Sequence, residues 1–251
     1  YYGGFRLLVN GTLEWDGYTF FSELFDININ EYPFDEGKGI IKFSLGECKG
    51  TIKFPSKVVM IEFTSGAIIC QTEKNEFYAW GYEKILPIDQ SIHKPRNDGN
   101  FIKPVSCSNM PIGHIVSFKI LYYNNIIFLT EEGLVYKCGF EYLDDKGKAI
   151  YSRIPKLIKN IPLIKKISSC EFNFSLLDYK GNIWTFGKYI IRSLDPDFER
   201  KNAIDSIKLP FEPVMIKRND ITNIIDISKD GYFTFVKTQN GDIFYFGYDH
   251  P

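Results

Sequence analysis

The side chains that most often carry out catalysis or bind metal are few and scattered in this chain. Its three histidines, His93, His114 and His250, are not spaced as metal ligands. The sequence has no nucleophile elbow and no phosphate-binding loop, because Gly37-Lys38-Gly39 lacks both the upstream glycine and the hydroxyl residue that such a loop needs. These patterns predict neither covalent nor metal catalysis, and they indicate no cofactor.

Two clusters of carboxylates lie in segments that we expect to connect strands. One is formed by Asp144 and Asp145, and the other by Asp195 and Asp197. Neighbouring carboxylates in a loop are typical of solvated turns, where a short acidic side chain bonds its own backbone. We interpret both clusters first as turn residues.

Cysteine content and charge narrow the classes of protein further. The five cysteines are odd in number and include no C-x-x-C pair, which predicts neither a disulfide framework nor a zinc site and favours a reducing, intracellular environment. The 30 basic and 31 acidic residues give a net charge of −1, so the chain lacks the basic excess of a general nucleic-acid binder. Its apolar runs are far shorter than a membrane span. The cysteines are Cys48, Cys70, Cys107, Cys138 and Cys170.

A short pattern, G-x-apolar-x-x-x-G, occurs five times along the chain. Its closing glycines are 64, 58, 48 and 60 residues apart, a period that indicates a repeat architecture. The copies begin at Gly11, Asn75, Gly133, Gly181 and Gly241.

Each copy reads as a β-hairpin. An apolar stretch such as Ile126–Leu129 precedes a short polar run, and an aromatic-rich stretch follows it. The five opening residues are therefore predicted turn positions with positive φ, which glycine adopts without strain. Asn75 supports this interpretation, because asparagine also tolerates that conformation.

Further strands are predicted beside the hairpins. The apolar stretches at Val58, Ile115, Ile164 and Ile224 begin 17 or 18 residues before the last four turn positions, and the first copy lacks such a stretch. A fourth strand is expected near Pro55, Pro104, Pro155 and Pro213, since proline suits an edge strand. Units of four strands in series predict an all-β fold, a β-propeller of about five four-stranded blades forming a single domain over residues 1–251.

The units 115–139, 164–187 and 224–247 resemble repeats of the regulator of chromosome condensation family. The resemblance is closest over Phe128–Gly139 and Leu176–Gly187, which match the family pattern apolar-x-L-(T/D)-x-x-G-x-(V/I)-(Y/W)-x-(W/F)-G. It extends to all five copies, but the family's Gly and His between the first two strands and its G-Q-L-G segment are missing. The family usually has seven blades, so the chain is either a smaller ring or a piece of a longer one.

The resemblance also predicts a partner-binding hairpin in the connection after Gly139. A hairpin called the β-wedge leaves the propeller at this point in the founding member, an exchange factor for the GTPase Ran. A plain loop is the alternative, since Asp-x-Gly segments are common in ordinary hairpins. The residues that the resemblance assigns to partner binding are Phe140, Glu141, Tyr142, Asp144, Asp145, Lys146 and Gly147.

The resemblance implies a guanine-nucleotide exchange factor or regulator of a small GTPase, with Ran as the first candidate. Such a protein needs no general base or nucleophile, and Asp144 and Asp145 would attract the lysine of the GTPase phosphate loop. The alternative is a non-catalytic interaction propeller, such as an adaptor or a substrate-recognition module. The expected location is intracellular, in the cytosol or nucleus, or in the host cytosol if the chain is a bacterial effector.

Overall fold

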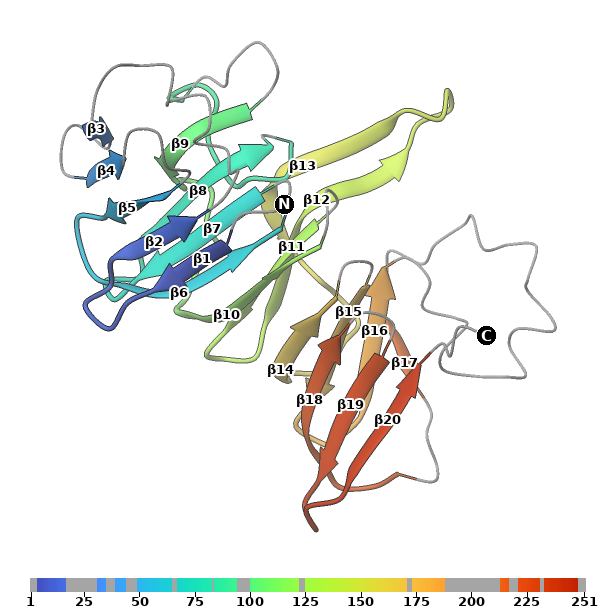
Figure 1. Ribbon diagram of the computed structural model, residues 1–251. Helices are drawn as coiled ribbons and strands as arrows, with labels where there is room; N and C mark the ends of the chain where they lie inside the picture. Colours follow the sequence, from blue (N-terminus) through green and yellow to red (C-terminus); the bar gives the residue numbers. More distant parts are fainter. Residues whose placement is uncertain are drawn as a thin grey trace, which may run out of the picture. The chain divides into compact units, whose positions relative to one another are not determined.

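The computed structural model is all-β, as the repeats predict, and within the residues described it contains 20 strands and no helix (Figure 1). The described residues are 4–16, 31–34, 39–43, 49–64, 67–82, 84–93, 100–121, 125–170, 173–187, 213–216, 221–230 and 233–247.

The strands form five antiparallel sheets, which we describe in chain order. The first has five strands in the order β1-β2-β5-β4-β3, the next three have four strands each in sequence order, and the last has three. The first sheet contains β1 (Gly4–Leu7), β2 (Leu13–Asp16), β3 (Glu31–Phe34), β4 (Gly39–Phe43) and β5 (Lys49–Lys53). The second contains β6 (Val58–Phe63), β7 (Ala67–Thr72), β8 (Phe77–Tyr82) and β9 (Asn100–Ser106). The third contains β10 (Ile115–Ile120), β11 (Asn125–Thr130), β12 (Val135–Leu143) and β13 (Ala149–Leu157). The fourth contains β14 (Ile164–Ser169), β15 (Asn173–Asp178), β16 (Ile183–Gly187) and β17 (Val214–Ile216), and the last contains β18 (Ile224–Asp230), β19 (Phe233–Thr238) and β20 (Ile243–Gly247).

The chain groups into two compact units. One comprises residues 1–110 and 138–155, and the other comprises residues 111–137 and 156–251. The division falls within β12 and β13, so the distal part of that hairpin belongs to the first unit. The single domain expected from the sequence stays a prediction.

A five-residue turn connects the strands of each repeated hairpin. In the third sheet, the Thr130 N–H donates to the Leu134 carbonyl over 2.9 Å, and the Gly133 N–H donates to the Thr130 carbonyl over 3.0 Å. The fourth residue of the turn must have a positive φ to close this loop, which is the role of a left-handed residue in a three-residue hairpin loop. The observed φ values are 80° at Gly11, 61° at Asn75, 84° at Gly133, 83° at Gly181 and 92° at Gly241.

In the last four sheets, the first strand pairs with the second through an irregularity at one fixed place. The register shifts between residues 58 and 60, 115 and 117, 164 and 166, and 224 and 226. A β-bulge of this kind increases the local twist. Its recurrence shows that the last four sheets are copies of one unit in geometry as well as in sequence.

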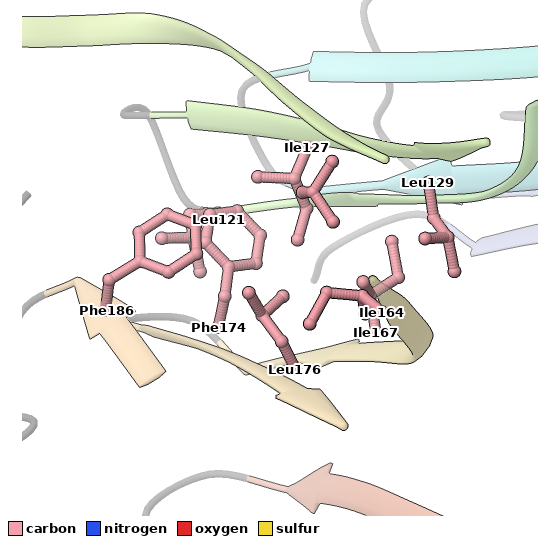
Figure 2. Close-up of a cluster of buried hydrophobic side chains, with 9 residues drawn as sticks. Leu121, Ile127, Leu129, Ile164, Ile167, Phe174, Leu176 and Phe186 are labelled. Carbon is pink, nitrogen blue, oxygen red and sulfur yellow. The ribbon is translucent and has the colours of Figure 1, made fainter. Parts of the chain in front are cut away.

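The middle strand of the fourth sheet is buried on both faces. Phe174 and Leu176 of β15 pack against Ile127 and Leu129 of the preceding sheet (Figure 2), and Leu177 packs on the other side with the last sheet. Two-sided burial explains why β15 is a nearly continuous apolar run and does not alternate. The core of this unit therefore lies between successive sheets.

One strand prediction is wrong. The strand that follows the hairpin of β1 and β2 in the first sheet is β5 (Lys49–Lys53), and it ends before Pro55. The other three prolines lie in or directly before β9, β13 and β17, as expected. The Phe54–Lys57 segment connects β5 to β6 and is not a strand. The sequence also gave no signal for β3 and β4, because their segments lie outside the repeated pattern.

Candidate functional site

The seven residues predicted for partner binding lie on one hairpin. Phe140, Glu141 and Tyr142 belong to β12, and Asp144–Gly147 form the turn to β13. These two strands have nine residues each, whereas β11 and β15 have six (Figure 1). The hairpin therefore offers two surfaces and a tip that a blade of ordinary length does not have.

Asp144 holds the tip of this hairpin in shape. Its Oδ1 accepts hydrogen bonds from the Lys146 N–H over 3.0 Å and the Lys148 N–H over 2.8 Å. The Gly147 N–H donates to the Asp144 carbonyl over 2.8 Å, and the φ of Gly147 is 75°. Asp144 is thus a turn-forming residue, and one of its oxygens is already engaged by the backbone.

The same turn occurs in the fourth sheet. Asp178 Oδ1 accepts from the Lys180 and Asn182 N–H groups, both over 2.8 Å, and the φ of Gly181 is 83°. The two loops share the pattern Asp-x-Lys-Gly-x. The tip at Asp144–Lys148 is therefore built as an ordinary blade turn, and what distinguishes it is its position at the end of longer strands.

An aromatic group anchors the base of the hairpin in the first unit. Phe140 is buried and meets the Tyr151 ring edge to face, with 5.8 Å between centroids. Lys84 Nζ lies 5.9 Å from the Tyr151 ring and 5.5 Å from the Tyr82 ring, within the range of a cation–π interaction. Burial raises the pKa of Tyr151, the neighbouring Tyr82 adds to this, and Lys84 opposes it.

The outer part of the hairpin is open to solvent. Tyr142 is 54% exposed close to the tip, and Asp145, Lys146 and Gly147 at the tip are all exposed. Ile154, which is 62% exposed, lies nearer the base of the hairpin. An exposed aromatic side chain beside a polar tip suits a protein-binding surface, where tyrosine is enriched. The hairpin offers contact area and charge, with no group placed for proton transfer or nucleophilic attack.

The repeat pattern in the sequence did not identify all the residues that pack around Tyr151. Tyr82, Lys84 and Tyr151 lie outside the repeat motif and come together through the tertiary structure. For Tyr151, the available signal is that aromatic residues continue beyond Gly139, with Phe140, Tyr142 and Tyr151. No pattern in the sequence points to Tyr82 or Lys84.

A metal site was also sought among the described residues. They include no group of three or more His, Cys, Asp or Glu residues that could hold a metal ion. His250, Cys48, Asp195 and Asp197 lie outside the described part of the chain. Within that part, no helix is long and apolar enough to cross a membrane.

Comparisons with known proteins give a likeness in fold. No protein-family model matches the chain, and no curated protein matches it in sequence. Human WBSCR16 has a TM-score of 0.63 at 12% identity over 95% of this chain and 60% of its own. Yeast RCC1 (Prp20), crystallised with Kap60, has a TM-score of 0.62 at 14% identity over 98% of this chain and 54% of its own.

A separate structure of Prp20p from Saccharomyces cerevisiae, reported with its binding to Gsp1p and histones, has a TM-score of 0.55 at 13% identity and covers 98% of this chain. The present chain spans between 54% and 66% of the length of these three chains. The chain thus has the all-β fold of RCC1-type propeller proteins, the family whose repeats its sequence resembles.

Proposed function

We propose that this chain is a guanine-nucleotide exchange factor or regulator of a small GTPase, with Ran as the first candidate, and that the hairpin of β12 and β13 contacts the GTPase. The observation that supports this most is the hairpin itself. Its two strands are longer than the other described strands, and it exposes Tyr142 beside an acidic tip. An intracellular location, in the cytosol or nucleus, would suit this function.

The proposed mechanism is differential binding. A small GTPase holds its nucleotide through the phosphate loop and Mg²⁺. A protein that binds the nucleotide-free form more tightly than the loaded form must weaken nucleotide affinity by the same factor, because the coupling is reciprocal. This mechanism needs a binding surface and no catalytic side chain.

In the proposed complex, the two acidic residues of the tip have different parts. One oxygen of Asp144 accepts backbone hydrogen bonds in the turn, so the part of Asp144 is to keep the tip in the shape that the partner would meet. Asp145 is exposed and is the carboxylate better placed to meet the phosphate-loop lysine once the phosphate has left. Tyr142 would supply the apolar contact, since exposed aromatic residues are frequent anchors of interfaces.

Release of a fluorescent GDP analogue from Ran, in the presence of excess GTP, tests the proposal. The parent chain should accelerate release, and Tyr142→Ala or Asp145→Ala should each reduce the acceleration by about tenfold. Tyr179→Ala is a matched control, because Tyr179 occupies the position of Asp145 in the equivalent turn and is 63% exposed. Equal losses in all three variants would count against a specific role for the hairpin.

A non-catalytic interaction propeller is the second candidate. The exposed Tyr142 and Ile154 support it equally well, since they suit any protein partner with an apolar surface. This candidate predicts that the parent chain leaves GDP release from Ran unchanged and that Tyr142→Ala weakens binding to a different protein partner.

A further inference from the structure

The outer half of the hairpin of β12 and β13, residues 141–150, is a two-stranded ribbon that ends in an exposed tip (Figure 1). β12 has nine residues, whereas β11, its other neighbour in the sheet, has six, so β12 continues beyond its pairing with β11. A two-stranded ribbon is marginally stable in water by itself. The direction and the order of the ribbon therefore depend on the contacts at its base.

The backbone of β12 is unusual where this ribbon begins. Gly139 has a φ of 107°, inside the left-handed region that favours glycine. Gly81 of β8 has the same φ, and there the pairing of β8 with β9 shifts register, as in a β-bulge, which re-aims the strand beyond it. β8 ends at Tyr82, directly after Gly81, whereas β12 continues to Leu143 and carries the ribbon. Gly139 thus gives β12 the freedom to change direction, and side-chain contacts beyond it set that direction.

Four side chains at the base link the ribbon to the end of β8. Phe140 of β12 meets the Tyr151 ring of β13 edge to face, with 5.8 Å between centroids. Lys84 Nζ lies 5.9 Å from the centroid of the Tyr151 ring and 5.5 Å from that of the Tyr82 ring. Lys84 therefore joins a ring of the hairpin to a ring of the second sheet.

The segment that follows Lys84 holds its backbone in place. Ile85 and Leu86 are completely buried, and the Ile85 carbonyl accepts a hydrogen bond from the Cys138 thiol over 3.3 Å. These residues and the base of the hairpin belong to the same compact unit. The Lys84 side chain is exposed, but its ammonium is attracted to the faces of the two rings. The ammonium therefore stands on a firmly packed support.

We propose that Lys84 is a positioning residue for the ribbon: its ammonium, attracted to both tyrosine rings, fixes the direction in which residues 141–150 leave the sheet. Tyr142 and Asp145 lie on this ribbon, so Lys84 acts on a partner only through them. For partner binding, this inference rests on the proposed function. For the order of the ribbon, it rests on the contacts of Lys84 alone.

Residual dipolar couplings of the backbone amides, measured by NMR on the whole chain, test the order of the ribbon. In the parent, the couplings of residues 141–150 and those of β6–β9 should fit one alignment tensor. Lys84→Met keeps an unbranched side chain and removes its charge, so the couplings of residues 141–150 should shrink and no longer fit that tensor. Lys84→Arg should restore the parent couplings, because a guanidinium also stacks on aromatic rings.

Two further variants serve as control and as second test. Lys180→Met removes the charge of an exposed lysine in the equivalent turn of the fourth sheet, and it should leave the couplings of residues 141–150 unchanged. Tyr82→Leu removes one of the two rings and keeps Lys84, and it should loosen the ribbon as Lys84→Met does. Thermal melts show which variants are folded, and Tyr82→Leu decides the question if Lys84→Met unfolds.

The affinity for nucleotide-free Ran tests the consequence for binding. Lys84→Met should weaken this binding about threefold, and Lys84→Arg should not. A parent that does not bind Ran would contradict the proposed function, and the couplings would still decide the part of Lys84. Folded variants at Lys84 and Tyr82 that keep the parent couplings would overturn the inference. So would a parent ribbon that does not share the tensor of β6–β9, or a loosened ribbon that binds Ran as tightly as the parent.

Discussion

Single residues have their largest structural effects in the five-residue turns. Gly133 and Gly181 need a positive φ to close the loop, and a Cβ at either position would also approach the backbone of the next sheet. Asp144 and Asp178 serve the same turn with their side chains. Three features of the turn therefore contribute to stability: the positive φ of its glycine, the close approach of that glycine to the next sheet, and the hydrogen bonds of its carboxylate. Substitutions can separate these three contributions.

Gly181→Ala and Gly241→Ala separate the cost of φ from the cost of contact. Alanine in the left-handed region costs about 1–2 kcal/mol at either position. At Gly181 the new Cβ would also lie 3.2 Å from the Ile224 carbonyl oxygen, whereas at Gly241 nothing lies within 4 Å. Urea unfolding should show a greater loss of stability for Gly181→Ala, and equal losses would contradict the tight approach to Ile224.

Asp178 should make folding sensitive to acid. Burial acts to raise its pKa, but hydrogen bonds from Asn182, Trp184 and Lys180 outweigh burial, so the pKa is lowered. A carboxylate with a lowered pKa in the folded state contributes stability above its unfolded pKa of about 3.9, and this stability is lost as the pH falls through the folded pKa.

Melting temperatures measured from neutral pH down to acid should therefore fall less steeply for Asp178→Asn than for the parent. Asp178→Ala should cost about 1–3 kcal/mol at neutral pH, because it leaves two backbone N–H groups without their acceptor. Parallel curves for the parent and Asp178→Asn would contradict this account of Asp178.

Cys70 should be unreactive in the folded protein. Its side chain is completely buried on β7, and this burial raises the pKa of the thiol. Since the thiolate is the reactive form, iodoacetamide at mildly alkaline pH should label Cys70 only after unfolding. Peptide mapping by mass spectrometry reads this out, and rapid labelling of Cys70 in the native protein would show that β7 is open to solvent.

At the scale of elements, the hairpin of β12 and β13 joins an ordinary turn to strands of unusual length. The turn could be predicted from Asp144, Lys146 and Gly147, because a five-residue loop with a left-handed glycine is a local structure. The group around Tyr151 and Lys84 could not, since these residues are far apart in the sequence and no repeat relates them. The local structure of the turn could therefore be predicted from the sequence, whereas the tertiary contacts at Tyr151 could not.

Asp144→Asn and Asp144→Ala test the structural part played by the tip carboxylate. Asparagine keeps an oxygen that can accept from the Lys146 and Lys148 N–H groups, whereas alanine removes it. Amide exchange at these two residues should be faster in Asp144→Ala than in the parent, and near the parent rate in Asp144→Asn. The same rate in all three proteins would show that the side chain does not hold the turn.

At the scale of the whole molecule, the repeats predicted the all-β fold, because each five-residue turn and each bulge recurs in phase with the sequence. The five-stranded first sheet was not predicted, since β3 and β4 have no counterpart in the other units. The likeness to RCC1-type structures at 12–14% identity shows that this fold is compatible with very different sequences.

The affinity of the chain for Ran in two states tests the proposed function most directly. If the hairpin favours the nucleotide-free GTPase, calorimetry should show much tighter binding to nucleotide-free Ran than to Ran loaded with GDP and Mg²⁺, by a factor equal to the loss of GDP affinity in the complex. Tyr142→Ala should weaken binding to the nucleotide-free form, while Tyr179→Ala should not. Equal affinity for the two forms, or no binding to either, would contradict an exchange function on Ran.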